Sequence, residues 1–220
     1  MSSSAPPPTP PLDDVMRRAV HWDRDAVVRE YRKAARLAAT SPPVLDLGCG
    51  SGTLLETLSA LGVTAEGVDA SPTAVRECRQ RGLAVTEGDL LGFLGAARPA
   101  TWGAVCAAHV IEHMPPAEAR ELFAHAARVL RPGGLFILMT PNPRNLYVAG
   151  EGFWTDPTHV RPYPATLLRA LALDAGFSSM YVRGWWGGLT PRQVVLGVIR
   201  WFVTAGLHQP PTGLLAVARK

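Results

Sequence analysis

The chain has 220 residues, of which 47% are hydrophobic and 18% are charged. This length fits one α/β domain, and this composition excludes a chain that is disordered throughout. No run of about 18 apolar residues occurs, which by hydropathy excludes a membrane-spanning helix. The formal net charge is +4, but the basic residues are scattered arginines rather than a cluster, which argues against a nucleic-acid partner.

The first eleven residues, MSSSAPPPTPP, are rich in serine and proline. They have no basic and no apolar region of the kind found in signal peptides, and they predict a disordered tail. Residues 12–220 predict a single domain that begins with a helical segment over 12–40. The three cysteines are odd in number and widely spaced within apparent core segments, which favours a reducing, cytoplasmic setting.

After residue 40 the expected elements alternate between strands and helices. Strands are expected at 44–47, 63–68, 83–86, 102–108, 135–139, 177–183 and 214–218, and helices at 53–61, 71–81, 116–130 and 164–175. This alternation predicts a doubly wound, parallel α/β sheet with right-handed crossovers.

One segment departs from this alternation. Residues 185–208 lie between the last two expected strands and are apolar almost all round. The segment is too short to span a bilayer, so something must cover it: the protein's own sheet edge, a second subunit of a homodimer, or a lipid surface. We rank a dimer contact or a cover over the active site first, and peripheral membrane contact through residues 189–205 second.

The first strand ends in a glycine turn, Gly48 to Gly52, and a helix follows. In a doubly wound sheet this is where a ligand lies, because the turn lets backbone approach it and the helix offers free amides. Asp69, at the next strand end, suits the two hydroxyls of a ribose. A dinucleotide is the rival ligand, but Thr53 stands where its fingerprint needs a small residue, and Asp46 would repel phosphates. A ligand with a positive group explains Asp46 better.

The stretch VLDLGCGSG at residues 44–52 resembles motif I of class I S-adenosylmethionine-dependent methyltransferases. GVDAS, EGDL, WGAVCAAHVIEHMPP and LRPGGLFILMT follow in that family's order and spacing. The resemblance implies a Rossmann-like, seven-stranded, mostly parallel sheet of order 3-2-1-4-5-7-6 with the last strand antiparallel.

The same resemblance implies S-adenosylmethionine as the cofactor. The residues that it assigns to cofactor binding are Asp46, Gly48, Cys49, Gly50, Asp69, Ala70, Asp89, Leu90 and His109. The glycine turn would hold the methionine part, and Asp46 would face its amino end. Asp69 would bind the ribose, and Asp89 with Leu90 would flank the adenine.

A hydroxyl acceptor must lose its proton when it is methylated, which directs attention to histidines and acids on neighbouring loops. One interpretation makes His113 or His159 a general base. A second makes Glu112, His113 and His159 the ligands of a divalent ion such as Mg, Mn or Zn, which would exclude the base role. A third gives His113 a capping role and His159 a bond to the loop backbone. Because these residues and His109 fall on adjacent loops at the ligand end, we favour the functional interpretations.

The segment IEHMPP is similar to that of ubiquinone-biosynthesis O-methyltransferases, and the loop FWTDPTHVRPYP to methyltransferases of bacterial polysaccharide loci. The segment also resembles metal-dependent small-RNA 2'-O-methyltransferases, but His109 replaces the first glutamate of their E-x-x-E-H pattern. The leading hypothesis is O-methylation of a hydroxyl on a sugar, a glycan or another small metabolite. The alternatives are metal-dependent RNA 2'-O-methylation and a cofactor-binding partner subunit without turnover.

Overall fold

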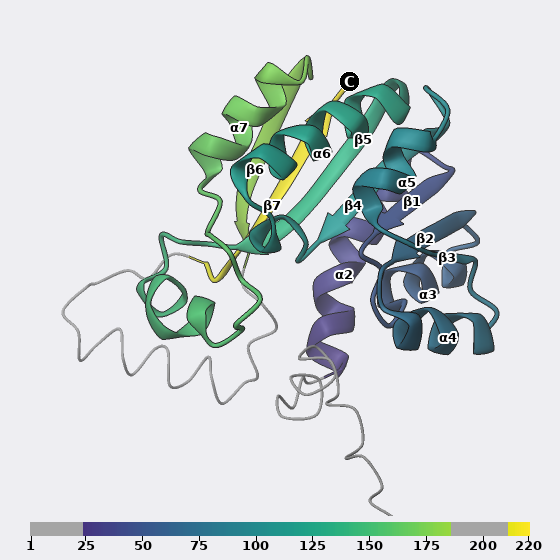
Figure 1. Ribbon diagram of the computed structural model, residues 1–220, viewed down its shortest axis with the longest axis horizontal. Coiled ribbons are helices and arrows are strands. Elements are labelled where there is room, and N and C mark those ends of the chain that lie inside the picture. The colour runs from purple at the N-terminus through teal and green to yellow at the C-terminus, as the bar shows by residue number, and fades with distance from the viewer. Residues whose placement is uncertain (1–23, 186–210) are drawn as a thin grey trace, which may run out of the picture.

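Figure 1 shows the computed structural model, in which helices cover both faces of a twisted sheet. The structure describes residues 24–185 and 211–220, with side chains over 28–184 and 211–220. The predicted tail at 1–11 therefore lies outside the described residues. So do the apolar segment 185–208, apart from the backbone of its first residue, and its proposed membrane contact at 189–205.

The described residues form one sheet of seven strands. These are β1 (Val44–Leu47), β2 (Ala65–Asp69), β3 (Val85–Glu87), β4 (Trp102–Ala108), β5 (Leu130–Pro141), β6 (Ser179–Trp185) and β7 (Gly213–Arg219). The strand order is β3-β2-β1-β4-β5-β7-β6, and β7 is antiparallel to both of its neighbours. The predicted fold class is confirmed.

The helices lie between the strands and on either side of the sheet. They are α2 (Arg24–Ala38), α3 (Thr53–Ala60), α4 (Pro72–Gln80), α5 (Leu90–Ala96), α6 (Pro116–Val129) and α7 (Ala165–Asp174), with a 3-10 turn η1 (Ile111–His113) and a π-helical turn η2 (Val148–Gly152). Of these helices, α5 is not among the elements expected from the sequence, because Gly92 and Gly95 weaken its helical signal. The Asp89 carboxylate caps it by accepting a bond from the Gly92 amide at 2.7 Å.

Successive side chains of the sheet serve two different cores, because strand residues point alternately to opposite faces. Leu45 and Leu47 belong to the core beneath α5, α6 and α7, whereas Val44 belongs to the core beneath α2 and α3 (Figure 1). Strand β4 is buried at every position, as a strand covered on both faces should be. The parallel strands β1, β2 and β4 end at one edge of the sheet, so the segments that follow them lie together there.

The cysteines are consistent with the reducing setting that the sequence predicts, which itself stays a prediction. Cys49, Cys78 and Cys106 are all buried and free. Burial raises the pKa of the Cys49 and Cys106 thiols, so both behave as small apolar side chains rather than nucleophiles. Within the described ranges, no helix combines the length and apolar character needed to cross a bilayer.

Candidate functional site

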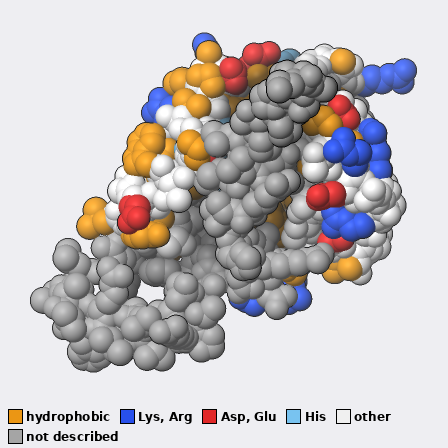
Figure 2. Space-filling model, turned by 60° about the horizontal axis from the view of Figure 1, so that its bottom comes forward, with side chains coloured by type: hydrophobic (Ala, Val, Ile, Leu, Met, Phe, Trp, Pro, Cys, Tyr) orange, Lys and Arg blue, Asp and Glu red, His pale blue; other side chains and the backbone are white. Residues whose placement is uncertain are grey.

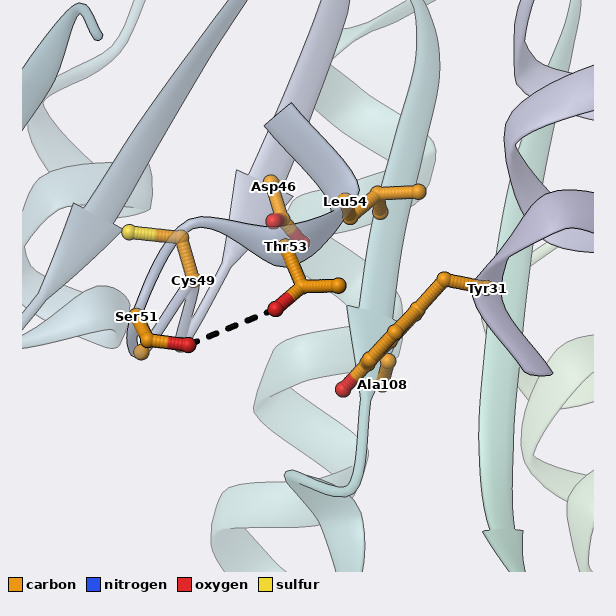
Figure 3. Close-up of a pocket in the computed structure, with 9 residues that line it drawn as sticks. Tyr31, Asp46, Cys49, Ser51, Thr53, Leu54 and Ala108 are labelled. Carbon is orange, nitrogen blue, oxygen red and sulfur yellow. Dashed lines mark hydrogen bonds between the residues drawn. The ribbon is translucent and has the colours of Figure 1, made fainter. Parts of the chain in front are cut away.

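A pocket opens at the edge where β1 and β4 end. It is lined by Tyr31, Asp46, Gly48, Cys49, Gly50, Ser51, Thr53, Leu54 and Ala108. Figure 3 shows the turn after β1 on one side of this pocket and the Tyr31 side chain reaching toward it from α2 on the other. Most of the predicted cofactor-binding residues of the first strand and its turn therefore line one pocket.

The glycine turn needs glycine for its backbone and for the space beside it. Gly48, Gly50 and Gly52 have φ of +62°, +50° and +78°, which other residues rarely adopt. A Cβ at Gly48 would lie 2.7 Å from the Val110 side chain, whereas one at Gly50 would project into open space. Because α3 begins at Gly52 without a side-chain cap, its first amides remain available to a ligand.

Asp46 is a buried acid that lacks a partner. Its side chain belongs to a residue only 3% exposed, and its carboxyl makes no hydrogen bond among the described residues. Burial and the negative charge of Asp69 raise its pKa from 3.8 to about 8. A buried carboxylate is costly unless it is paired, so a positively charged ligand group would complete this part of the pocket.

Asp69 ends β2 beside the glycine turn. Its two carboxylate oxygens accept bonds from the amides of Gly50 at 2.7 Å and Ser71 at 2.8 Å. These bonds fix the carboxylate at the strand end, and each oxygen can accept a second bond. The ribose assignment is compatible with this geometry and stays a prediction.

The predicted adenine side of the site is more open. Asp89 is exposed and uses one carboxylate oxygen to cap α5, and Leu90 is half-buried at the first position of that helix. Ala70 is exposed and follows Asp69 directly. The structure thus places these three residues along the same sheet edge, and their cofactor contacts stay predictions.

His109 lies between the pocket and the next group of polar side chains. It has a φ of +56°, and its Nδ1 and Nε2 atoms each lie 3.2 Å from a carboxylate oxygen, of Glu112 and Glu30 respectively. Its side chain is 40% exposed, so burial lowers its pKa little, and hydrogen bonds to these carboxylates and their charges raise the pKa from 6.5 to about 10. Both ring nitrogens are therefore paired with carboxylates. His109 follows the pocket residue Ala108 in the chain, and its contact with the cofactor stays a prediction.

Glu112 is fully buried and connects three segments. Besides the bond to His109, its carboxylate accepts one from the Thr140 hydroxyl at 3.0 Å, and its carbonyl accepts one from the Val160 amide at 2.8 Å. Burial acts to raise the pKa of Glu112, but the bond and charge of His109 bring it below its ordinary value. The carboxylate is ionised and joins η1 to β5, and the backbone carbonyl holds η1 against the loop that carries His159.

His113 and His159 lie side by side, with ring centroids 4.7 Å apart. The Thr158 hydroxyl lies 2.6 Å from an Asp156 carboxylate oxygen and 2.9 Å from Nδ1 of His113. Because this hydroxyl donates its proton to Asp156, Nδ1 of His113 donates to the hydroxyl. Nδ1 of His159 donates to the Phe153 carbonyl at 2.6 Å. In the neutral form of each ring, Nε2 is therefore the nitrogen with the free lone pair.

The structure brings together the three residues predicted as base or metal ligands. Glu112, His113 and His159 each offer one ligand atom, and these atoms lie within 4.8 Å of one another. Two imidazoles and a carboxylate suit a divalent ion such as Zn²⁺, although both Glu112 oxygens already accept bonds. His159 does bond the loop backbone, as the third interpretation predicted, but this occupies only Nδ1. The metal stays a prediction.

Tyr31 is the pocket residue that sequence reasoning missed. A tyrosine at helical spacing among apolar residues predicts a core position, and no further signal in the sequence marks it. In the described part of the chain its hydroxyl makes no hydrogen bond. Burial, followed by the charges of Asp46, Glu30 and Glu112, raises its pKa above the ordinary value, so the hydroxyl stays protonated.

Comparisons with known proteins agree with this geometry. A family model described as a methyltransferase domain matches residues 19–181. A ubiquinone biosynthesis O-methyltransferase of Xanthomonas oryzae pv. oryzae (strain PXO99A) is 32% identical over 135 residues, which cover 55% of this chain and 56% of that protein. The chain thus spans about half the length of the curated relatives that it matches.

Solved structures share the fold. A SAM-dependent methyltransferase of Archaeoglobus fulgidus superposes with a TM-score of 0.81 at 21% identity and covers 94% of this chain and 99% of that chain. A SAM-dependent methyltransferase of Thermotoga maritima superposes with a TM-score of 0.68 at 14% identity, covering 95% of both chains.

Proposed function

This chain belongs to the methyltransferase domain family, and from that premise we propose that it methylates a hydroxyl group of a sugar, a glycan or another small metabolite with S-adenosylmethionine. The observation that supports a hydroxyl acceptor best is the pair of Nε2 atoms of His113 and His159, whose rings meet where the segment after β4 and the loop after β5 come together. A proton acceptor at this place suits an acceptor that must lose a proton.

The pocket fits S-adenosylmethionine. When bound, this cofactor supplies a methyl group on a positively charged sulfur. Asp46 offers the buried carboxyl that a cationic group would pair with, Gly50 leaves open space beside the turn, and the first amides of α3 suit a carboxylate. The Asp69 carboxylate is held in place for hydroxyl groups by two backbone amides.

We assign the base role to His113 rather than His159. Nδ1 of His113 is bonded through the Thr158 hydroxyl to the Asp156 carboxylate, which leaves Nε2 of His113 free. Nδ1 of His159 faces a neutral carbonyl, and its Nε2 lies 4.0 Å from the other oxygen of the same carboxylate. Burial acts to raise the pKa of Asp156, but the bonds from Thr158 keep it below its ordinary value. An ionised carboxylate behind the ring stabilises the imidazolium that forms when Nε2 of His113 takes the acceptor's proton as the new O–C bond forms.

The same residues also suit a metal-assisted mechanism, which the experiments must separate from the histidine base. Glu112, His113 and His159 would hold a divalent ion, and such an ion would lower the pKa of an acceptor hydroxyl without any histidine base.

Two features count against RNA 2'-O-methylation and against a subunit without turnover. Methylation of RNA needs a basic stripe, but Lys and Arg side chains of described residues are interspersed with Asp and Glu on the face in Figure 2. A subunit without turnover has no need of two oriented histidines.

Calorimetric titration with S-adenosylhomocysteine, in EDTA and with added Mg²⁺, Mn²⁺ or Zn²⁺, tests the cofactor and the metal. We expect binding in EDTA that metal leaves unchanged. Transfer of labelled methyl from S-adenosylmethionine to catechols and monosaccharides, beside matched amino analogues, then tests the acceptor. Methylation of the amines alone would contradict the proposal, and so would a failure to bind the homocysteine product. Activity that disappears in EDTA and returns with metal would favour the metal mechanism.

A further inference from the structure

Tyr31 lines the pocket with a polar side chain to which the mechanism above gives no role. We propose that its hydroxyl oxygen contacts the positively charged sulfur and methyl group of the cofactor. Tyr31 would then favour binding of the charged cofactor over the neutral product. This inference rests on the proposed function, because it assigns a part of the same cofactor to a named side chain.

The position of the hydroxyl supports the sulfur end of the cofactor rather than its amino end. Asp46 belongs to β1 and precedes the glycine turn, whereas Tyr31 lines the same pocket as Ala108, the last residue of β4, and its side chain crosses Ala108 in the view of Figure 3. The segment after Ala108 leads directly to Glu112 and His113. Methyl transfer requires the methyl group to face the acceptor, and Tyr31 is at the side of the pocket from which these residues continue.

The charges around the hydroxyl favour a cation. The acidic groups of Asp46, Glu30 and Glu112 act electrostatically on Tyr31. The charges of Glu30 and Glu112 are offset by their shared partner His109. Asp46 has no cationic partner among the described residues, so a bound cation would stabilise its ionised form. The hydroxyl stays neutral there, so its oxygen presents lone pairs, and the ring presents the negative face that attracts cations. A sulfonium is therefore favoured over the neutral thioether that remains after transfer.

The position of Tyr31 is fixed by its helix. Ala34, Ala35 and Ala38 of α2 are at most 1% exposed and pack on the core beneath that helix. At the neighbouring position, Glu30 pairs with His109 at 3.2 Å, and His109 pairs with Glu112. These pairs join helix α2 to the segment that carries His113. The Tyr31 hydroxyl is therefore held between the cofactor pocket and the histidine cluster.

The test compares ligands that differ in charge at the reacting centre. Calorimetry would measure the Kd of S-adenosylmethionine, of sinefungin, whose amine replaces the sulfonium, and of neutral S-adenosylhomocysteine, for wild type, Tyr31→Phe and Tyr31→Leu. We expect Tyr31→Phe to weaken both cationic ligands about tenfold and the neutral one by less than about twofold. Tyr31→Leu should weaken the cations further, because it also removes the ring.

Tyr181→Phe is the matched control, since Tyr181 is 65% exposed on β6, and it should change no Kd. Thermal melts would establish that each variant is folded. Equal weakening of all three ligands, or none, in folded Tyr31→Phe would overturn the assignment to the sulfur. If wild type bound none of the ligands, the proposed function would fail instead.

Discussion

The cofactor pocket and the histidine cluster differ in whether their polar side chains are hydrogen-bonded within the protein. In the pocket, the side chains of Asp46 and Tyr31 make no hydrogen bonds to the described residues, and burial raises the pKa of both. In the cluster, Glu112 accepts bonds at both carboxylate oxygens and His113 is oriented through Nδ1. A buried carboxyl without a cationic partner is costly to ionise, so the Asp46 side of the pocket is completed only when a positively charged ligand enters. In the cluster, by contrast, these hydrogen bonds already fix the orientation of the His113 ring without any ligand.

Removing the base should have the largest effect. His113→Ala should lower kcat about 10²- to 10⁴-fold, the usual contribution of general base catalysis. The Kd of S-adenosylhomocysteine should not change, because the pocket does not include His113. His159→Ala should lower kcat less, and His125→Ala, on an α6 surface beside Glu121, is the control. If His113→Ala and His159→Ala lowered kcat equally and both lost a bound metal, the result would favour a metal-assisted mechanism over a histidine base.

Asp46→Asn should abolish the pocket's preference for cations. We expect the Kd of S-adenosylmethionine to rise about 100-fold, since removing one partner of a buried ion pair costs about 3 kcal/mol or more. The control is Glu118→Gln, because Glu118 is exposed on the first turn of α6. Glu56 is less suitable, since it pairs with Arg81. Unchanged affinity in Asp46→Asn would show that the cation is held elsewhere.

The raised pKa of Asp46 also predicts a pH dependence. In the unfolded chain this carboxyl has a pKa near 3.8 and in the free folded protein near 8, so between these values only the folded state holds the proton. Stability should therefore fall as pH rises from 4 to 8, by up to about 1.4 kcal/mol per pH unit, and level off above 8. Denaturant unfolding at several pH values would show this slope in wild type, and its absence in Asp46→Asn.

Much of this arrangement could be predicted from the sequence, because local signals determine it. The glycine turn places Asp46 and Gly50 at a strand end, and strand alternation places Asp69 and Glu112 at the same sheet edge. Tyr31 could not be predicted, since its role depends on how α2 packs across the sheet. The pairing of His109 with Glu30, 79 residues apart, likewise has no local signal.

Glu112→Gln should destabilise the protein while keeping part of the cluster's hydrogen bonding. The variant can keep a bond to Thr140 but loses the charge that pairs with His109. Because His109 is 40% exposed, solvent screens this pair, and we expect a loss of about 1 kcal/mol in unfolding free energy. Chemical denaturation would measure it, with Glu118→Gln again as the control. A variant as stable as wild type would mean that the cluster does not depend on this ion pair.

The smallest effect should come from Thr158→Val. It removes the hydroxyl between Asp156 and Nδ1 of His113 and should lower kcat about tenfold with little change in KM. Because the residue acts through His113, the pH at which activity rises should move as well. Thr158→Ser should restore both. A change in KM alone would mean that Thr158 merely shapes the loop.

The reversed direction of β7 has a consequence for how such proteins diversify. Trp185 and Gly213 pair with each other where β6 ends and β7 begins, and Gly213 also pairs with Pro141 at the end of β5. The chain between β6 and β7 therefore leaves and rejoins the sheet at one edge, the edge of the catalytic loops. Its length and sequence can change over evolution without altering any strand pairing. Exchanging residues 186–210 between related proteins should accordingly leave the pairing of β5, β6 and β7 intact.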